Sequence, residues 1–436
     1  MKASNVLHYS LRWLYKSIAI FLVVIAVLIS CLRLFLPYAQ DYRDDLQNYI
    51  NNTYQTNIII GHLNTGWASK GPTLVVKNIS LLSAKGLEIF IGNFEVEIDF
   101  WKSIQNQKLI TTNFTIDNAK VLIEPTGKNK APKTSGEQII LEQLSDLFLT
   151  QIPRFTINNS QVKIFVAGSP KDLSIAQLSW TNKGKRHQGQ GEIIVNGLSS
   201  KKLKLLVDIN GDSKETLTGH AYFEAKNIDV APWLNDVIAT ENNTDSSINF
   251  QSWLQIENGS AKELIVDLGE NHISWFANDE NEKLMINEGY FVVEASENYD
   301  YLGIYSSDVK WQVNDKKPQS LEFNAHLAYG NFSGFISTLD IESALALNPL
   351  FIADTDTQAT LTDIGANGRL DNIFFKYQKD LKVVSDFNEI STDYYNNIPG
   401  LVGLNGKIAY QRNKVHVEVQ GENGVIDFGP HFKRPI

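Results

Sequence analysis

The chain has 436 residues, of which 43% are hydrophobic and 20% charged, and its formal net charge is -10. The first 36 residues hold four basic residues and no acidic ones, so the remaining 400 hold 35 basic and 49 acidic residues. This acidic balance argues against nucleic acid, and against an anionic membrane surface, as a partner of the larger part. The single cysteine, Cys31, leaves no possible internal disulfide. Four hundred residues exceed one compact core of ordinary size, so we expect several domains or one elongated structure.

An uncharged stretch near the N-terminus predicts a membrane anchor. Residues 17–32 contain no charge, and residues 17–36 include only Arg33, whose long side chain can reach the membrane interface from its place near the end. A helix of about 20 residues crosses ~30 Å of hydrocarbon. We therefore predict one transmembrane helix at residues 17–36. The side chains expected to anchor it in lipid are Ile18, Phe21, Val24, Val27 and Leu32.

The charges that flank this helix predict its orientation. Lys2, Arg12 and Lys16 precede it, whereas a mainly acidic segment that begins at Asp41 follows it. Because positive charge marks the cytoplasmic side, we expect residues 1–16 in the cytoplasm of a bacterium, an inner-membrane location, and the rest in the periplasm. A cleaved signal peptide is an alternative, although Ala39 is a poor cleavage site. Another alternative is a lipoprotein cut before Cys31, but the hydrophobic run continues beyond that cysteine.

Two further helices are predicted. A short amphipathic helix at residues 37–54 would present Tyr42, Leu46, Tyr49 and Ile50 on one side. A second helix at about residues 136–150 begins with a capping box, in which Ser135 is followed by a glutamine three residues later. We interpret both helices as packing elements.

Most of residues 55–436 alternates between apolar and polar residues, which is typical of strands with one apolar face. Turn signals such as Asn159-Ser160, Asn210-Gly211, Asn258-Gly259 and Asn405-Gly406 separate these segments and favour a long antiparallel meander. The apolar positions predicted to line its inner face are Phe94, Val96, Ile98, Phe100, Val121, Ile123, Phe155, Ile157, Leu203, Leu205, Val207, Ile209, Leu254 and Ile256.

Few helices are available to cover so many apolar strand faces, and a large exposed apolar surface is a liability unless it binds something. Sandwiches whose sheets cover each other, or a closed barrel, would solve this problem. The remaining interpretation is a mainly β fold in which a curled antiparallel sheet forms an elongated apolar groove suited to acyl chains. We expect no cofactor other than such a lipid, carried as a ligand.

The sequence offers no strong catalytic or metal-binding motif. The eight histidines do not have zinc-pair spacing, and Gly189 and Gly191 form only a fragment of a glycine-rich loop. Asp354 and Asp356 could pair on a metal, but a solvated loop explains them better. We therefore expect neither an enzyme nor a metal protein.

A series of short motifs in a shared order carries a family resemblance. The motifs are Gly66-Trp67, Gly71-Pro72-Thr73-Leu74, Phe100-Trp101-Lys102-Ser103, Ser145-Asp146-Leu147-Phe148-Leu149, Ile228-Asp229-Val230-Ala231-Pro232-Trp233-Leu234 and Ile273-Ser274-Trp275. With the anchor and the short helix before them, they make the chain resemble the N-terminal portion of the YhdP family of AsmA-like proteins.

This resemblance implies a repeating β-groove, an inner-membrane helix at one end, and passage of phospholipid toward the outer membrane. It implies no catalytic residues, and it suggests that the chain is truncated at its C-terminal end relative to family members. Partners would be the inner membrane, phospholipid and envelope proteins at either membrane. A scaffold for outer-membrane assembly that binds proteins by strand addition, without lipid transfer, is the alternative function.

Overall fold

The computed structural model describes residues 2–54, 57–68, 70–82, 87–107, 110–123, 149–150, 152–166, 169–195, 202–231, 243–277, 280–296, 300–352, 354–396, 398–420 and 424–429. The chain divides into two compact units, here called unit 1 (1–163 and 179–181) and unit 2 (164–178 and 182–436). The helix predicted at about residues 136–150 lies outside the described residues except for its last two positions.

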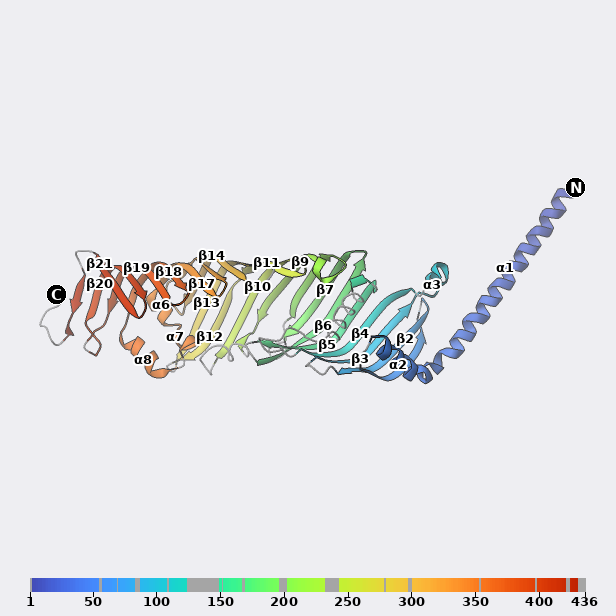
Figure 1. Cartoon of the computed structure of the whole chain (residues 1–436), viewed down its shortest axis with the longest axis horizontal. Coiled ribbons are helices and arrows are strands. Elements are labelled where there is room, and N and C mark those ends of the chain that lie inside the picture. Colours follow the sequence, from blue (N-terminus) through green and yellow to red (C-terminus); the bar gives the residue numbers. More distant parts are fainter. Residues whose placement is uncertain are drawn as a thin grey trace. The chain divides into compact units, whose positions relative to one another are not determined.

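Unit 1 begins with the long helix α1 (Lys2–Phe35) (Figure 1). Among the described residues, one helical stretch is long and apolar enough to cross a membrane: Trp13–Cys31, with a mean hydropathy of 2.5 and no buried residues. The 3-10 helix η1 (Leu36–Tyr42) and the helix α2 (Arg43–Tyr54) follow. Leu46 and Ile50 of α2 pack against a buried cluster of Ile60, Leu63 and Val76. Tyr42 and Tyr49, predicted on the same side, are exposed instead.

The strands of unit 1 are β1 (Ile58–Trp67), β2 (Pro72–Leu82), β3 (Leu87–Ile98), β4 (Thr111–Ile123) and β5 (Arg154–Val166), the last of which ends in unit 2. β1 to β4 pair antiparallel in chain order, but β5 pairs parallel with β4. The prediction of a purely antiparallel sheet was therefore wrong at this point. A parallel pair needs a crossover connection of a dozen or more residues, and the segment 124–153 is long enough to provide it.

The strand predicted through Phe100 is shorter than expected. β3 ends at Ile98, and Phe100 opens the helix α3 (Phe100–Asn106). The cause is Asp99, whose carboxylate accepts a hydrogen bond from the Lys102 backbone N–H (3.0 Å) and so caps this helix. Phe100 packs its ring 5.7 Å from that of Trp67.

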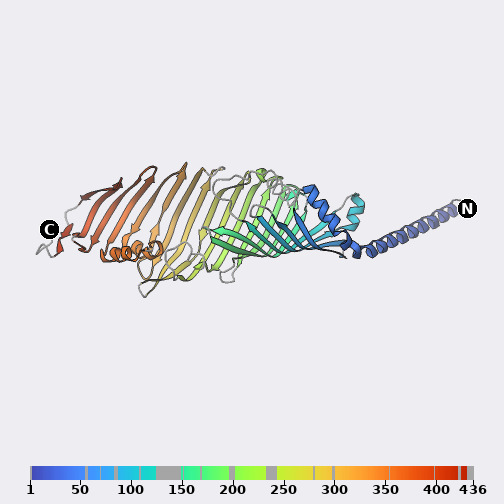
Figure 2. The ribbon, with the colours of Figure 1, turned by 60° about the horizontal axis from the view of Figure 1, so that its bottom comes forward.

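The strands of unit 2 are β6 (Ser169–Lys183), of which residues 179–181 belong to unit 1, β7 (Arg186–Val195), β8 (Lys202–Asn210), β9 (Thr218–Ile228), β10 (Asn243–Glu257), β11 (Ser260–Leu268), β12 (Asn271–Ala277), β13 (Glu280–Ala295), β14 (Tyr301–Val313), β15 (Gln319–Leu321), β16 (Phe323–Ala328), β17 (Asn331–Asp340), β18 (Asn367–Tyr377), β19 (Leu381–Thr392), β20 (Gly400–Gln411), β21 (Lys414–Gln420) and β22 (Val425–Asp427). From β7 onward, the strand pairings between described residues are antiparallel, and the strands succeed one another along the sheet (Figure 2). Within these described residues, two short strands share a neighbour in three places: β11 and β12 both pair with β10 and β13, β15 and β16 with β14, and β21 and β22 with β20.

Short helices interrupt unit 2. The 3-10 turn η3 (Lys214–Thr216) lies between β8 and β9, and α6 (Ile341–Leu345), α7 (Asn348–Phe351) and α8 (Thr355–Asp363) connect β17 to β18. Leu350 of α7 belongs to a buried cluster with Trp275 of β12 and with Trp311 and Val313 of β14. The prediction of a mainly β chain with an N-terminal helix and few others is confirmed.

Aligned asparagines and glycines bend the strands of unit 1. Asn78 in β2, Asn118 in β4 and Asn159 in β5 have positive φ angles of 54°, 54° and 46°. Gly61 in β1 and Gly92 in β3, in strands next to them, leave room for the asparagines, since a Cβ on either glycine would lie 2.9 Å from an asparagine side chain. The cross-strand register continues unshifted through this level, so these left-handed residues bend the strands without leaving a residue unpaired. Asn159-Ser160, predicted as a turn, is therefore such a bend inside β5.

A candidate apolar binding face

One face of the unit 2 sheet carries an unbroken row of uncharged residues, which we call the apolar track. Each member is the direct cross-strand partner of the next, so all of them lie on the same face. The row runs through twelve strands from β8 to β21: Val207, Ala221, Leu254, Leu264, Val293, Ile304, Ala325, Gly334, Phe375, Val383, Tyr410 and Val415. With neighbouring strands about 4.8 Å apart, it extends for about 50 Å along the sheet.

The residue row directly beside the track lies on the reverse face and is almost entirely polar, and we call it the polar track. Its members are Asp208, His220, Gln255, Glu263, Glu294, Gly303, His326, Ser333, Lys376, Lys382, Gln411 and Lys414. In each of these strands, the polar-track residue is thus the sequence neighbour of the apolar-track residue, and the two point to opposite faces of the sheet. The face that carries the apolar track is called the groove face below.

The groove face is only partly covered by protein. Most track residues are half-buried, and Val415 is 61% exposed. Leu350 of the small helix α7, with Ala346 and Leu347 just before it, packs on the Trp275–Trp311 cluster, and Ala225 and Ile228 form a second buried cluster with Phe250 and Leu173. Between and beyond these clusters, apolar side chains such as Phe332 and Leu381 remain exposed to 40% and 43%. An apolar ligand could therefore reach the face.

In unit 1 the apolar face of the sheet is densely packed. The cross-strand row Val76, Phe94, Ile116 and Ile157 joins β2 to β5, and Leu74, Val96, Phe114 and Phe155 form the next row on the same face. Val76 and Ile116 are buried, and Phe94 contacts the cluster on which α2 lies. The opposite face carries Glu95, Thr115 and Thr156 in register.

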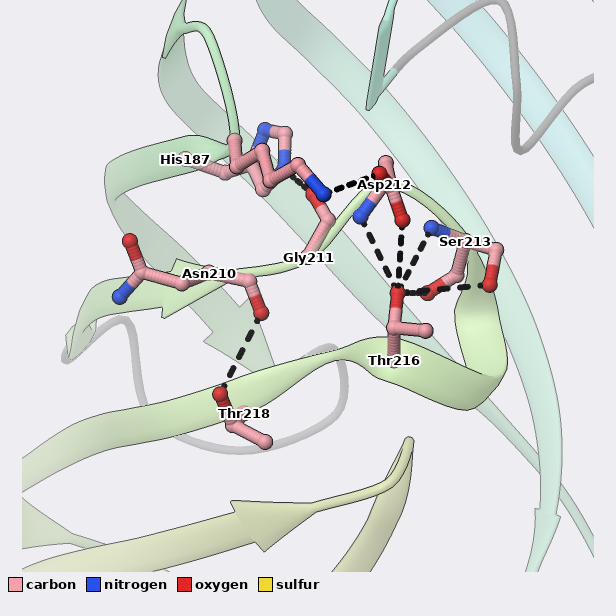
Figure 3. Close-up of polar contacts among 8 residues, drawn as sticks. His187, Asn210, Gly211, Asp212, Ser213, Thr216 and Thr218 are labelled. Atoms are coloured by element: carbon pink, nitrogen blue, oxygen red, sulfur yellow. Dashed lines mark hydrogen bonds and ion pairs between the residues drawn. The ribbon is translucent and has the colours of Figure 1, made fainter.

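His187 is a fully buried polar side chain on the groove face, because it is the cross-strand partner of Ile209. One ring nitrogen lies 2.7 Å from Asn182 Oδ1. The other lies 2.6 Å from the Gly211 carbonyl oxygen (Figure 3). In the turn between β8 and β9, Thr216 Oγ1 accepts hydrogen bonds from the Asp212 and Ser213 backbone N–H groups. His187 therefore fixes this turn, and neither ring nitrogen is left for acid–base chemistry.

Ion pairs cover much of the reverse face. The hydrogen bond from Arg186 lowers the pKa of Asp208, and the hydrogen bond from Lys226 lowers the pKa of Glu224, to which Lys204 also lies close. The Arg186 and Asp208 side chains approach to 2.5 Å. These paired charges face water and keep the reverse face of β7 to β9 polar.

The structure brings most of the predicted groove residues together on two faces. Leu203, Leu205, Val207 and Ile209 alternate along β8 on the groove face of unit 2, and Leu254 and Ile256 join them from β10. Phe94, Val96, Val121, Phe155 and Ile157 share the apolar face of unit 1, with Ile98 at the end of β3. Ile123 ends β4, but its side chain, like that of the anchor residue Leu32, is outside the described part. Phe100 lies in α3 and is not part of the row. Ile18, Phe21, Val24 and Val27 are exposed or half-exposed along α1.

Since only Val207 and Leu254 were predicted to line the groove, sequence reasoning missed ten of the twelve residues of the apolar track. Ala221, Ala325 and Gly334 belong to it, but these small residues do not raise the apolar signal of a strand. Phe375 also escaped notice because Phe374 precedes it, and two adjacent phenylalanines break the alternation. The signal that could have identified these residues is the absence of charge at every second position of a strand.

Three comparisons relate the chain to known proteins. The profile of the YhdP protein family matches residues 1–436, which confirms the resemblance carried by the ordered motifs. The intermembrane phospholipid transporter YhdP of Escherichia coli (strain K12) is 25% identical over 278 residues, covering 62% of this chain and 21% of the relative. The match thus spans about a fifth of that relative's length. No solved structure matches the chain.

Proposed function

Because this chain belongs to the YhdP family, we propose that it is a membrane-anchored conduit along which phospholipid moves between the inner and outer membranes of a bacterial envelope. The observation that carries the proposal is the apolar track, an uncharged row across twelve strands that protein covers only in part. The similarity to an intermembrane phospholipid transporter supports the choice of ligand.

The physical task of such a conduit is to keep acyl chains out of water. Burial of a methylene is worth about 0.8 kcal/mol, so a chain of about sixteen carbons costs on the order of 12 kcal/mol to expose. A face of Val, Ile, Leu and Phe side chains replaces the lost membrane contacts, while the headgroup stays in water. No bond is made or broken, and the proposal assigns no catalytic residue and no cofactor.

The anchor and its flanks complete the proposal. Helix α1 would hold the chain in the inner membrane with residues 1–16 in the cytoplasm and the β units in the periplasm. A row of apolar side chains lowers the free-energy barrier to lipid movement equally in both directions. Its two ends are alike in chemistry, so a gradient, a partner or an energy source elsewhere sets the direction of transport.

A site-specific photo-cross-linker tests the proposal. We expect benzoylphenylalanine at Val266, on the groove face of β11, to cross-link phospholipid in cells. The matched control is the same probe at the adjacent Ile265, which is similar in size and half-buried but lies on the reverse face. Lipid adducts at position 266 that are absent at 265 support a conduit. Protein adducts at both positions without lipid would instead favour the assembly scaffold.

A further inference from the structure

The reverse face of β16 to β19 contains a cavity that the conduit does not use. Its volume is about 720 Å³, within the range of about 300–1,000 Å³ that is usual for small-molecule sites. One side of the cavity consists of His326, Ser333, Lys376 and Lys382, four consecutive members of the polar track. The other side is the next row on the same face, where Phe335, Phe374 and Val384 are direct cross-strand partners.

The lysines of this cavity are arranged unusually. Lys376 lies directly opposite Lys382, and like charges in this arrangement destabilise a sheet. Among the described residues, neither lysine has a carboxylate within ion-pair distance, and the cavity lining contains no Asp or Glu. Elsewhere on the reverse face, Lys204 pairs with Glu224, and Lys310 with Glu288. In a chain with a net charge of -10, this is a local positive site that no carboxylate of the described residues neutralises.

Aromatic contacts shape both sides of the cavity. The Phe335 and Phe374 rings lie 4.8 Å apart, and Phe374 is 55% exposed. On the cationic side, the Tyr301 hydroxyl is 3.1 Å from His326 Nδ1 and 2.8 Å from the Tyr305 hydroxyl, so a hydrogen-bonded chain holds the imidazole in place. Both tyrosines lie over Gly303, where a Cβ would come within 2.6 Å of the Tyr301 hydroxyl. The glycine therefore makes the room in which this network forms.

From these observations we infer that the cavity binds a single-chain anionic amphiphile. The headgroup, a phosphate or a carboxylate, lies between Lys376 and Lys382, next to Ser333, with His326 one strand further along the polar track. The aliphatic chain lies on Phe335, Phe374 and Val384. Binding relieves the repulsion between the two lysines and covers exposed aromatic surface at the same time. The site is on the face opposite to the apolar track, so it stands whether or not the groove face conducts phospholipid.

Photolabelling of the full chain in phosphatidylcholine nanodiscs tests the inference. The probe is dodecyl phosphate with a terminal diazirine. We expect it to label peptides that contain Phe335 or Phe374, and a Lys376→Gln/Lys382→Gln variant to lower this labelling at least tenfold. The matched control is Lys204→Gln/Lys310→Gln, which removes two lysines from the same face and should leave the labelling unchanged. Ser333→Trp, which fills the centre of the cavity, should also abolish it.

Each other outcome overturns the inference. Labelling confined to groove-face peptides would show that the probe follows the conduit and not this cavity. Equal labelling by a diazirine derivative of neutral dodecyl maltoside would show that the lysines do not select an anionic headgroup. If millimolar inorganic phosphate alone prevented the labelling, the cavity would be a site for free anions and not for an amphiphile. A loss of labelling in the Lys204→Gln/Lys310→Gln control would show that general surface charge, and not the lysine pair, attracts the probe.

Discussion

A carboxylate placed on the apolar track should block lipid passage. Val207 is half-buried on β8, and its cross-strand partners, Gly189 and Ala221, are too small to cover a new charge. In Val207→Asp, an acyl chain crossing this position would therefore contact the carboxylate directly. An Asp in the centre of a membrane costs about 2.5–3.5 kcal/mol. Since Val207 is only half-buried, we expect about 1–2 kcal/mol, which corresponds to about a 5- to 30-fold slower passage.

The assay for this effect measures how much lipid reaches a track position on the far side of Val207. Benzoylphenylalanine at Val383, a track residue on β19, reports lipid that has entered the track at its β8 end and passed Val207. We expect lipid adducts at position 383 to fall 5- to 30-fold in Val207→Asp. The matched control is Leu206→Asp, because Leu206 adjoins Val207, is 38% exposed, and points to the reverse face. Equal losses in the two variants, or undiminished adducts in a folded Val207→Asp protein, would refute a track that conducts lipid.

Three further predictions concern the fold that carries the track. Leu350→Ala removes a buried contact of α7 with Trp275 and should lower the free energy of unfolding by about 2–5 kcal/mol, measured by denaturant titration of tryptophan fluorescence. Asn118→Ala places a Cβ-bearing residue without a side-chain amide at φ 54° and should cost about 1–2 kcal/mol, whereas Asn118→Gly should cost less; equal losses would contradict the role of the left-handed backbone at this position. The hydrogen bond from Arg186 lowers the pKa of Asp208, so its stabilisation is present above about pH 4 and is lost as the pH falls through the folded pKa. The difference in melting temperature between the wild type and Asp208→Asn should therefore shrink from pH 6 to pH 2.5, and a constant difference would contradict this assignment.

The sequence predicted strands well where charged and apolar residues alternate strictly. In β8, Lys204 and Asp208 face away from Leu203, Leu205, Val207 and Ile209, and a single strand shows the pattern without help from its neighbours. In β9 the groove-face residues are Ala221, Phe223 and Ala225, and their reverse-face neighbours include an aromatic residue, so the two faces differ too little in hydrophobicity. Here the face becomes clear only from the pairing with β8 and β10.

Asparagine signals were ambiguous for a physical reason. Asn and Gly adopt left-handed backbone conformations more readily than other residues, and such conformations occur in tight turns and in β-bulges alike. Asn258-Gly259 forms the predicted turn between β10 and β11, but Asn405-Gly406 lies inside β20, where the Asn405 side chain accepts a hydrogen bond from the Glu389 backbone N–H (2.8 Å). Glu389 itself has a φ of 52°. The Asn-Gly dipeptide itself cannot reveal whether a neighbouring strand contains a bulge whose backbone N–H needs a hydrogen-bond acceptor.

The apolar and polar tracks depend on bulges that occur at the same level in adjacent strands. A shift of one residue turns every side chain of a strand to the other face, so an extra residue in one strand would place charges on the groove face unless its neighbours contained a matching irregularity. The chain shows such matching: the Asn249 amide oxygen accepts a hydrogen bond from the Asn227 backbone N–H, and Asn271 does the same for the N–H of Asn249. Three strands, β9, β10 and β12, are thus joined by asparagines at their irregular positions. This arrangement lets the strands bend without mixing the two tracks, and it explains why a long row can stay free of charge across twelve strands.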